Sequence, residues 1–287
     1  MRYHTPENFE AASAIAAAAT GVTRFLAGGT DVLVQLRSDL VTPDDLIDIK
    51  HIAGVNEIAR TADGGWRIGA AVSGAEMSEH PELSGDWPGV VEATDLIGST
   101  QVQGRCTLVG NLCNGSPAAD GVPAMIAAGA TVSVLGPGGA REIAVEDVPT
   151  GPGRLSLAKG EVVTAVNLPA RGQHGGDAYL RFIPRTEMDI AVVGCGVSLR
   201  RDGDTITGAR VALGAVAPTV LLVADAGAAL VGSTLHDAAL AALAAAASAA
   251  CNPIDDKRGT IKFRTHVAGV LAKRAAKIAY DRAGDKK

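Results

Sequence analysis

Two glycines followed by two small polar residues, in the segment FLAGGTDV at residues 25–32, form the first pattern that could bind a ligand. Glycine lets the backbone approach a ligand closely and adopt a positive φ angle. If a helix begins at Thr30 or Asp31, its free N–H groups would make this corner an anion site. An ordinary corner between a strand and a helix explains the same residues. Neither GxGxxG nor GK[ST] is present, so the segment is not a Rossmann or Walker fingerprint.

A second candidate is the segment TLVGNLCNGSPAAD at residues 107–120, which is rich in residues that favour turns. Asp120 closes it, directly before a helix expected at residues 122–128. One interpretation is a loop that lies against a ligand. The other is a plain loop in which Asp120 is the N-cap of the next helix. The polar side chains and glycines that could contact a ligand are Thr107, Gly110, Asn111, Asn114, Gly115 and Ser116.

The third candidate is the charged stretch YLRFIPRTEMDIA at residues 179–191, which contains Arg181, Arg185, Glu187 and Asp189. It stands before an apolar run, and a solvated charged edge explains it equally well. The six histidines are scattered without motif partners, so none is assigned a role.

The elements expected around these segments alternate between helices and strands. Helical patterns cover Pro6–Thr20, Val32–Arg37 and Pro88–Ile97. The Gly-rich run Arg171–Gly176 predicts a domain boundary. After this boundary we expect two long strands joined by a turn, at Ile190–Leu199 and Ile206–Leu213, followed by helices at Thr234–Ala250 and Arg264–Ala283. Short strands are expected at Thr23–Ala27, Leu46–Ile49, Trp66–Ala71, Ala130–Leu135 and Glu161–Leu168.

Composition limits the function classes. The formal net charge is −5, which does not favour a nucleic-acid partner. The four cysteines form no CxxC pair, so a zinc or iron–sulfur site and a disulfide framework are not expected. The N-terminus lacks the apolar core of a signal peptide, and the Ala-rich run 238–250 is short for a transmembrane segment. We therefore expect a soluble, cytoplasmic protein.

Several motifs occur together in the order and spacing of one family. They are AGGTD at 27–31, LIDI at 46–49, IGA at 68–70, TLVGNLCNGSPAAD at 107–120, EVVTAVNLP at 161–169 and RTEMDIAVV at 185–193. Over nearly its full length the chain resembles the FAD-binding medium subunit of the molybdenum hydroxylases, which include carbon monoxide dehydrogenase and xanthine dehydrogenase. The resemblance implies an α+β fold of the vanillyl-alcohol-oxidase (PCMH) type. It divides the chain into an FAD-binding domain at 1–174, with subdomains of about 1–55 and 56–174, and a C-terminal sheet-and-helix domain at 175–287.

The resemblance also implies roles for individual residues. The first loop that cradles the FAD pyrophosphate matches Ala27, Gly28, Gly29, Thr30 and Asp31, and the second matches Thr107, Gly110 and Asn111. Backbone N–H groups and a hydroxyl suit a diphosphate. Asp120 matches an acidic residue that binds ribose or ribityl hydroxyls. Arg181 stands where a cation near the flavin N1 and C2 carbonyl would stabilise reduced flavin. Ile97 matches an apolar position near the adenine, and Val163 matches an apolar flavin contact. The positions that line the isoalloxazine ring match Cys113 and Asn114.

One departure from the family pattern is Val109, which stands where the family commonly has the first of two glycines. Either the backbone at this position needs no positive φ angle, or the loop shifts slightly. The family's IRN before this loop is also altered, to VQG at residues 102–104.

The function that the resemblance implies is electron transfer through FAD. Electrons would come from two-iron two-sulfur clusters on a small partner chain, and substrate would be oxidised at a molybdenum cofactor on a large one. The flavin would then reduce an external acceptor, and the complex would be a dimer of heterotrimers without a transmembrane segment. The alternatives are a self-contained flavin oxidoreductase of the same fold, or an assembly subunit that has lost FAD.

Overall fold

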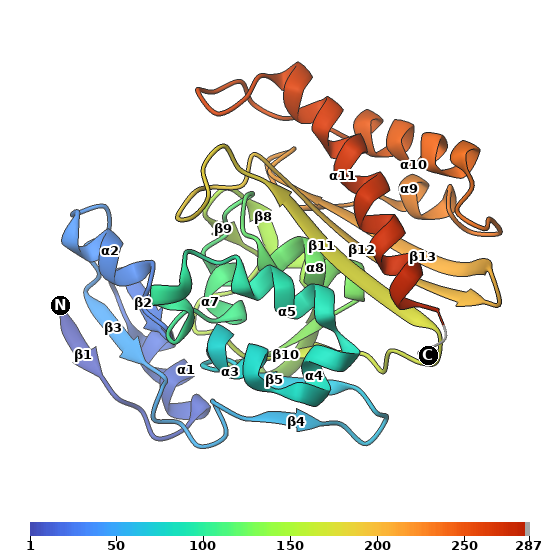
Figure 1. Ribbon diagram of the computed structural model, residues 1–287. Helices are drawn as coiled ribbons and strands as arrows, with labels where there is room; N and C mark the ends of the chain where they lie inside the picture. Colours follow the sequence, from blue (N-terminus) through green and yellow to red (C-terminus); the bar gives the residue numbers. More distant parts are fainter. Residues whose placement is uncertain (285–287) are drawn as a thin grey trace.

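The computed structural model describes residues 1–284 (Figure 1). The chain begins with a small parallel sheet in the order β1-β3-β2, formed by β1 (Arg2–His4), β2 (Thr23–Leu26) and β3 (Asp45–Asp48). Between β1 and β2 lies helix α1 (Phe9–Ala18), which is capped by the Asn8 side chain rather than starting at Pro6. The expected helix after the first glycine pair is confirmed as α2 (Val32–Arg37), and none of its residues is buried.

A five-stranded antiparallel sheet follows, in the order β4-β5-β10-β6-β7. Three of its strands confirm expectations within one or two residues, and the turn at Asp63–Gly65 joins β4 to β5 as a hairpin. The strand bounds are β4 (Ile58–Arg60), β5 (Trp66–Gly69), β6 (Thr131–Gly136), β7 (Gly139–Ala144) and β10 (Val162–Leu168).

Short helices connect the strands of this sheet. The helix expected at Pro88–Ile97 is confirmed as α5 (Pro88–Asp95), and the one at residues 122–128 as α8 (Gly121–Ala128). The segment 107–113 is not the plain loop that its composition predicts. It contains a helix, because the Thr107 side chain caps it and Leu108, Val109 and Leu112 are buried. The remaining connections are α3 (Gly74–Glu79), α4 (Pro81–Asp86), α6 (Thr100–Gln103), α7 (Leu108–Cys113), the 3₁₀ helix η1 (Val145–Asp147), β8 (Pro149–Gly151) and β9 (Arg154–Leu155).

The C-terminal part is a four-stranded antiparallel sheet with helices against both faces (Figure 1). Helix α11 packs on β11 and β12, and α8 packs on the opposite face of β12 and β13. The two long strands and two long helices that the sequence predicts are confirmed, whereas β11 was not predicted. The elements are β11 (Gly175–Phe182), β12 (Val193–Asp202), β13 (Thr205–Gly214), β14 (Leu221–Leu222), α9 (Ala224–Ala228), α10 (Asp237–Ala249) and α11 (Ile261–Arg282).

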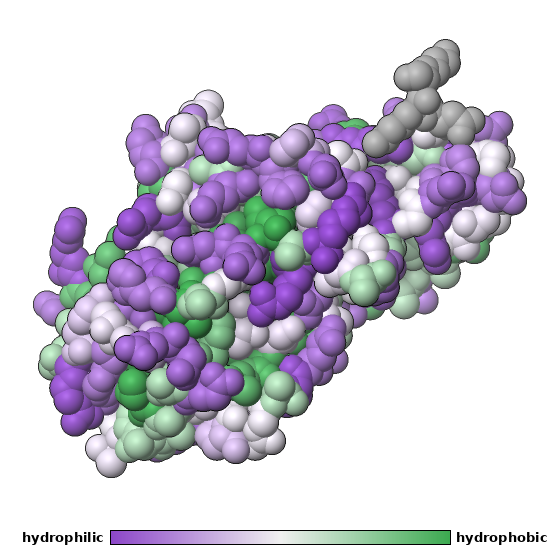
Figure 2. All heavy atoms as spheres, turned by 90° about the horizontal axis from the view of Figure 1, so that it is seen from below, coloured by the Kyte–Doolittle hydropathy of each residue, from purple (hydrophilic) through white to green (hydrophobic). Residues whose placement is uncertain are grey.

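Two hydrophobic clusters form the core. The larger lies mostly in residues 12–168 and includes both tryptophans, whereas the smaller lies between the C-terminal sheet and helices α9–α11. The face seen in Figure 2 is largely hydrophilic, with hydrophobic side chains recessed between polar ones. No helix within residues 1–284 combines the length and hydropathy needed to cross a membrane.

Candidate functional site

The first glycine loop leaves strand β2 and turns directly into α2. Gly29 has a φ angle of +79°, which a residue with a side chain rarely adopts. Gly28 faces the backbone at the end of α6, because a Cβ atom there would lie 1.7 Å from the Arg105 carbonyl oxygen. Among the described residues, the backbone N–H groups of Gly28, Gly29 and Thr30 find no acceptor. This corner therefore presents unpaired donors, as an anion site requires.

The second loop is the N-terminal turn of α7. The Thr107 hydroxyl oxygen accepts a hydrogen bond of 2.9 Å from the Gly110 N–H. The N–H group of Val109, in the first turn, finds no acceptor within residues 1–284, and Val109 lines the cavity described below. Val109 is helical and has a negative φ angle, so the backbone at this departure from the family pattern does not need glycine.

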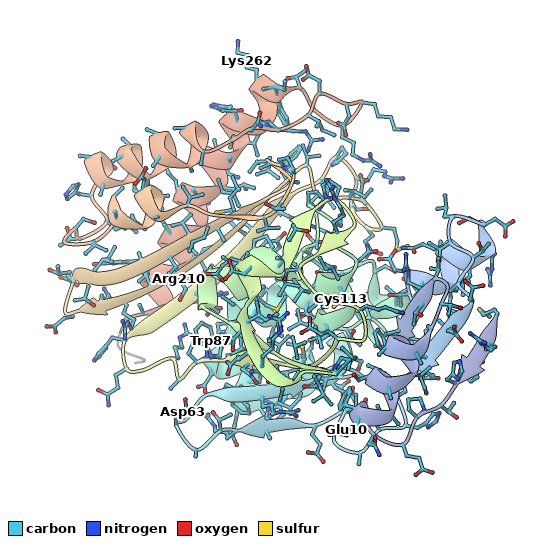
Figure 3. All side chains as sticks on the ribbon, turned by 180° about the vertical axis from the view of Figure 1, so that it is seen from behind. Glu10, Asp63, Trp87, Cys113, Arg210 and Lys262 are labelled. Atoms are coloured by element: carbon cyan, nitrogen blue, oxygen red, sulfur yellow. The ribbon has the colours of Figure 1, made fainter. Side chains whose placement is uncertain are left out.

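A cavity of about 570 Å³ lies between the two loops. This volume is within the range of small-molecule and cofactor sites. All the sequence-predicted site residues line it except Asp120 and Arg181. Cys113, labelled in Figure 3, lies on this wall near the middle of the molecule. The predicted residues on the wall are Ala27, Gly28, Gly29, Thr30, Asp31, Ile97, Thr107, Gly110, Asn111, Cys113, Asn114 and Val163.

A third wall of the cavity was not predicted. It consists of Gly153, Leu155 and Leu157, around the β8–β9 hairpin, and of Glu161 before β10. The hairpin is tied to the second loop, because the Gly153 N–H donates to the Gly115 carbonyl oxygen over 3.0 Å. Residues 149–157 carry no pattern that suggests a ligand, so only the tertiary structure could reveal this wall. The remaining lining residues are Thr23, Arg24, Phe25, Val32, Gln35, Ile49, Cys106, Val109 and Val162.

Two side-chain contacts order the polar part of the wall. Gln35 on α2 donates to the Asn114 amide oxygen over 3.3 Å, which joins the first loop to the end of α7. Asn111 accepts the Gly121 N–H through its amide oxygen over 2.9 Å. This bond fixes the orientation of the Asn111 amide, and its NH₂ group remains available as a hydrogen-bond donor.

The cavity wall beside Asn114 is less polar. Burial raises the pKa of the Cys113 thiol to about 12. The thiol is therefore neutral at pH 7 and acts as a small apolar group beside Val163 and Ile97.

The structure places Asp120 and Arg181 behind the cavity rather than on its wall. Arg181 donates to the Asp120 carboxylate over 2.7 Å and to the Leu96 carbonyl oxygen over 2.8 Å. The Tyr179 hydroxyl donates to the other Asp120 carboxylate oxygen over 2.9 Å. Burial raises the Asp120 pKa to about 6, although Arg181 and Tyr179 favour the charged form.

Asp120 occupies the N-cap position of α8, as one interpretation expects, but its side chain makes no cap hydrogen bond. Its carboxylate binds β11 instead. In a strand, alternate side chains share one face. Tyr179 and Arg181 of β11 share the face opposite to α11, and there they reach Asp120.

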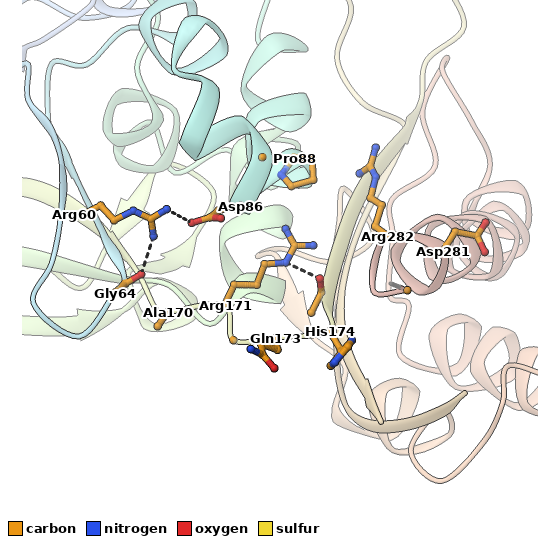
Figure 4. Close-up of a pocket in the computed structure, with 14 residues that line it drawn as sticks. Arg60, Gly64, Asp86, Pro88, Ala170, Arg171, Gln173, His174, Asp281 and Arg282 are labelled. Carbon is orange, nitrogen blue, oxygen red and sulfur yellow. Dashed lines mark hydrogen bonds and ion pairs between the residues drawn. The ribbon is translucent and has the colours of Figure 1, made fainter. Parts of the chain in front are cut away.

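A larger cavity of about 870 Å³ lies elsewhere, at the junction between the N-terminal and C-terminal parts (Figure 4). Three arginines line it, and each is already engaged. Arg60 contacts Asp86 over 2.8 Å, Arg171 donates to the Gly175 carbonyl oxygen over 2.8 Å, and Arg282 pairs with Glu92. None of the sequence-predicted residues lies there, so the smaller cavity is the better candidate site.

Comparison with known proteins identifies the family of the chain. Residues 1–171 match the family described as the FAD binding domain in molybdopterin dehydrogenase. The chain belongs to this family. Residues 178–279 match a second family, the CO dehydrogenase flavoprotein C-terminal domain.

Two relatives and one solved structure are similar over at least nine tenths of their length. The carbon monoxide dehydrogenase medium chain of Hydrogenophaga pseudoflava is 32% identical over 98% of both chains. A putative xanthine dehydrogenase FAD-binding subunit of Escherichia coli is 30% identical over 92% of this chain and 90% of its own. A solved carbon monoxide dehydrogenase from H. pseudoflava superimposes with a TM-score of 0.94, covering 99% of this chain and 98% of the other.

The FAD-binding family thus accounts for the fold. The named relatives are subunits of oxidoreductases, and this chain is an oxidoreductase flavoprotein of the medium-chain type. Within residues 1–284, no group of three or more His, Cys, Asp or Glu side chains could hold a metal ion.

Proposed function

We propose that this chain is the FAD-binding electron-transfer subunit of a multi-subunit molybdenum hydroxylase. The observation that carries the proposal is the cavity between two loops whose backbone N–H groups are unpaired. An anionic diphosphate needs such donors, and a relative named for FAD binding is similar over 92% of this chain. When bound, FAD would accept electrons and pass them to an external acceptor.

The chain's own residues would bind and orient the cofactor. Gly28, Gly29 and Thr30 would donate from one side of the diphosphate, and the first turn of α7, with Asn111, from the other. Thr107 would hold that turn in place through its bond to Gly110. Cys113 and Val163 would form the apolar part of the wall beside the flavin and exclude water from it, and Ile97 would pack near the adenine. Asp120 and Arg181 would affect FAD indirectly, because Arg181 binds the carbonyl oxygen of Leu96, which precedes Ile97. To contact FAD directly, both side chains would have to rearrange.

The organisation of the chain and its complex is part of the same proposal. A PCMH-type domain at 1–174, with subdomains of about 1–55 and 56–174, would bind FAD, and residues 175–287 would form the second domain. The two hydrophobic clusters and the two matched family ranges support this division. A small iron–sulfur chain would donate electrons, a large chain would hold the molybdenum cofactor, and the assembly would be a cytoplasmic dimer of heterotrimers.

A visible absorption spectrum of the purified full-length chain tests the proposal. We expect flavin bands, either as isolated or after addition of FAD, and co-purification with a large and a small chain from the native source. A colourless chain that takes up no FAD would refute the proposal and favour an assembly role. A yellow monomer that oxidises a substrate without partners would favour a self-contained flavin oxidoreductase.

A further inference from the structure

Arg24 is a cavity residue that the family motifs do not include. It lies on β2, three residues before Ala27, lines the cavity and is exposed. Its guanidinium donates only to the carbonyl oxygen of its neighbour Thr23, over 3.1 Å. No carboxylate within residues 1–284 lies at ion-pair distance from it.

The strand geometry puts Arg24 on the side of the first glycine loop. Side chains two residues apart in a strand share a face, so Arg24 and Leu26 point the same way. Leu26 lies directly beneath the loop, since its Cδ1 atom is 3.0 Å from the Cβ position of Gly29. Arg24 therefore shares a face of β2 with a residue that touches the loop, and it lines the same cavity as Thr23, Phe25 and Ala27 of the other face.

The other charges of the wall are negative. Asp31 and Glu161 are the carboxylates among the described lining residues, and Arg24 is the one lysine or arginine. The charge of Glu161 is offset, because Arg141 binds its two oxygens over 2.6 and 2.8 Å. Arg181 is engaged behind the wall, so it does not contribute a cation to the cavity surface. Without Arg24, the wall would present a net negative charge to an anionic ligand.

We propose that Arg24 forms an ion pair with the diphosphate of FAD and supplies the positive charge that the two backbone loops lack. The proposal rests on FAD binding as proposed above and adds a side chain to it. A guanidinium suits the task because it stays charged and presents several donors in a fixed geometry to phosphate oxygens. Charge-assisted hydrogen bonds of this kind are stronger than neutral ones.

The test compares cofactor affinities of the full-length apoprotein and three variants by fluorescence and calorimetric titration. Arg24→Gln removes the charge, and Arg24→Lys keeps a point charge. Arg37→Gln is the matched control, because Arg37 lies on the adjacent α2, is exposed, and does not line the cavity. We expect Arg24→Gln to raise the Kd for FAD and for ADP by at least roughly tenfold. Arg24→Lys should lose less affinity for FAD and ADP, and Arg37→Gln should bind both with the affinity of the wild type.

Phosphate-free probes separate the ion pair from other effects. Riboflavin and adenosine should bind to Arg24→Gln and to the wild type with equal Kd. Added salt should reduce the difference in the Kd for FAD between the two proteins. An unchanged Kd for FAD in Arg24→Gln would overturn the inference, as would an equal loss for riboflavin or adenosine. Thermal unfolding of each variant checks that the fold is retained. A wild-type chain that binds no FAD would refute the proposed function itself, whereas equal FAD binding by wild type and Arg24→Gln would refute only this ion pair.

Discussion

Gly28 is the residue at which the two sides of the cavity touch. A Cβ atom at this position would overlap the Arg105 carbonyl oxygen at 1.7 Å, and that oxygen belongs to the backbone and cannot swing away. Gly28→Ala should therefore push the first loop away from the segment that leads into α7. We expect a loss of about 2 kcal/mol in the free energy of unfolding and a loss of most of the bound FAD.

Gly104 offers the control for this substitution. It lies one residue from Arg105, its φ angle is −69°, and a Cβ atom there would meet nothing within 4 Å. Gly104→Ala should retain FAD and stability. The measurements are the flavin content after gel filtration and the midpoint of thermal unfolding. If Gly28→Ala kept the flavin content and the unfolding midpoint of the wild type, the close contact at Gly28 would not be needed for FAD binding.

Asp120 tests whether a residue behind the wall matters to the cofactor. Asp120→Ala leaves Arg181 without its buried carboxylate, and Arg181 holds Leu96 beside Ile97. We expect flavin retention to fall, because a buried unpaired charge is strongly destabilising. Cys251→Ser, remote from the cavity, should retain flavin. Equal flavin content in the two variants would count against any role for Asp120.

At the scale of single residues, sequence patterns identify those positions whose chemistry is local. The sequence identifies the glycine loops because the residues that determine their backbone conformation are consecutive. The sequence also identifies Asp120 and Arg181 as site residues, but it does not show where they lie. Their position depends on the contacts of Asp120 with Tyr179 and Arg181, which follow it by 59 and 61 residues. Arg24 has no local pattern at all, and its isolation from carboxylates appears only in three dimensions.

At the scale of elements, α7 is a helix of six residues that depends on its cap. Helices this short are marginal in water, and an N-cap threonine contributes about 1 kcal/mol. Thr107→Ala should lower the free energy of unfolding by about that amount, and should also weaken FAD binding. The reason is that the Val109 N–H group would no longer be fixed toward the cavity.

Thr260 caps α11 in the same way, with its hydroxyl oxygen 3.1 Å from the Phe263 N–H, and it lies outside the cavity. Thr260→Ala should lower the free energy of unfolding by about as much as Thr107→Ala, without any change in the Kd for FAD. Denaturant unfolding and FAD titration of both variants make the comparison. A Kd equal to that of the wild type in Thr107→Ala would show that the cap is structural only.

The sequence-based prediction of elements failed where tertiary contacts override local signals. The segment 107–113 contains glycine and asparagine, which favour turns, but burial of Leu108, Val109 and Leu112 makes it helical. Strand β11 was missed because Gly175 and Gly176 suggest a linker. Gly176 is required because α11 crosses here, with the Ala279 carbonyl oxygen 1.9 Å from a Cβ position at Gly176.

At the scale of the whole molecule, β11 joins the two parts through buried carboxylates. Asp177 and Asp120 lie on either side of this junction, and burial raises the pKa of each to about 6. Their unfolded pKa is near 4. Between these values the folded chain binds more protons than the unfolded chain, so stability falls as pH rises from about 4 to about 6.

Asp177→Asn should flatten this dependence. The variant no longer titrates, yet its amide oxygen can still accept the Val90 N–H, which lies 3.2 Å from the Asp177 carboxylate. Denaturant unfolding at pH 4.5, 5.5 and 6.5 should show a slope reduced by up to roughly 1 kcal/mol per pH unit relative to wild type. Asp45 and Asp189 do not interfere, because cationic partners lower their pKa values and they titrate below this window. An unchanged slope would contradict the assignment.

Val109 has a consequence for how members of this family can vary. Its helical backbone needs only a free N–H and an ordinary φ angle, and every residue type except proline provides the donor. Glycine at this site is thus one solution among many, whereas Gly28 and Gly29 are fixed by a steric overlap and a positive φ angle. A search pattern built on the paired glycines of the second loop would reject chains whose cofactor cavity is intact. A pattern built on the glycines of the first loop and on the capping Thr107 would retain them.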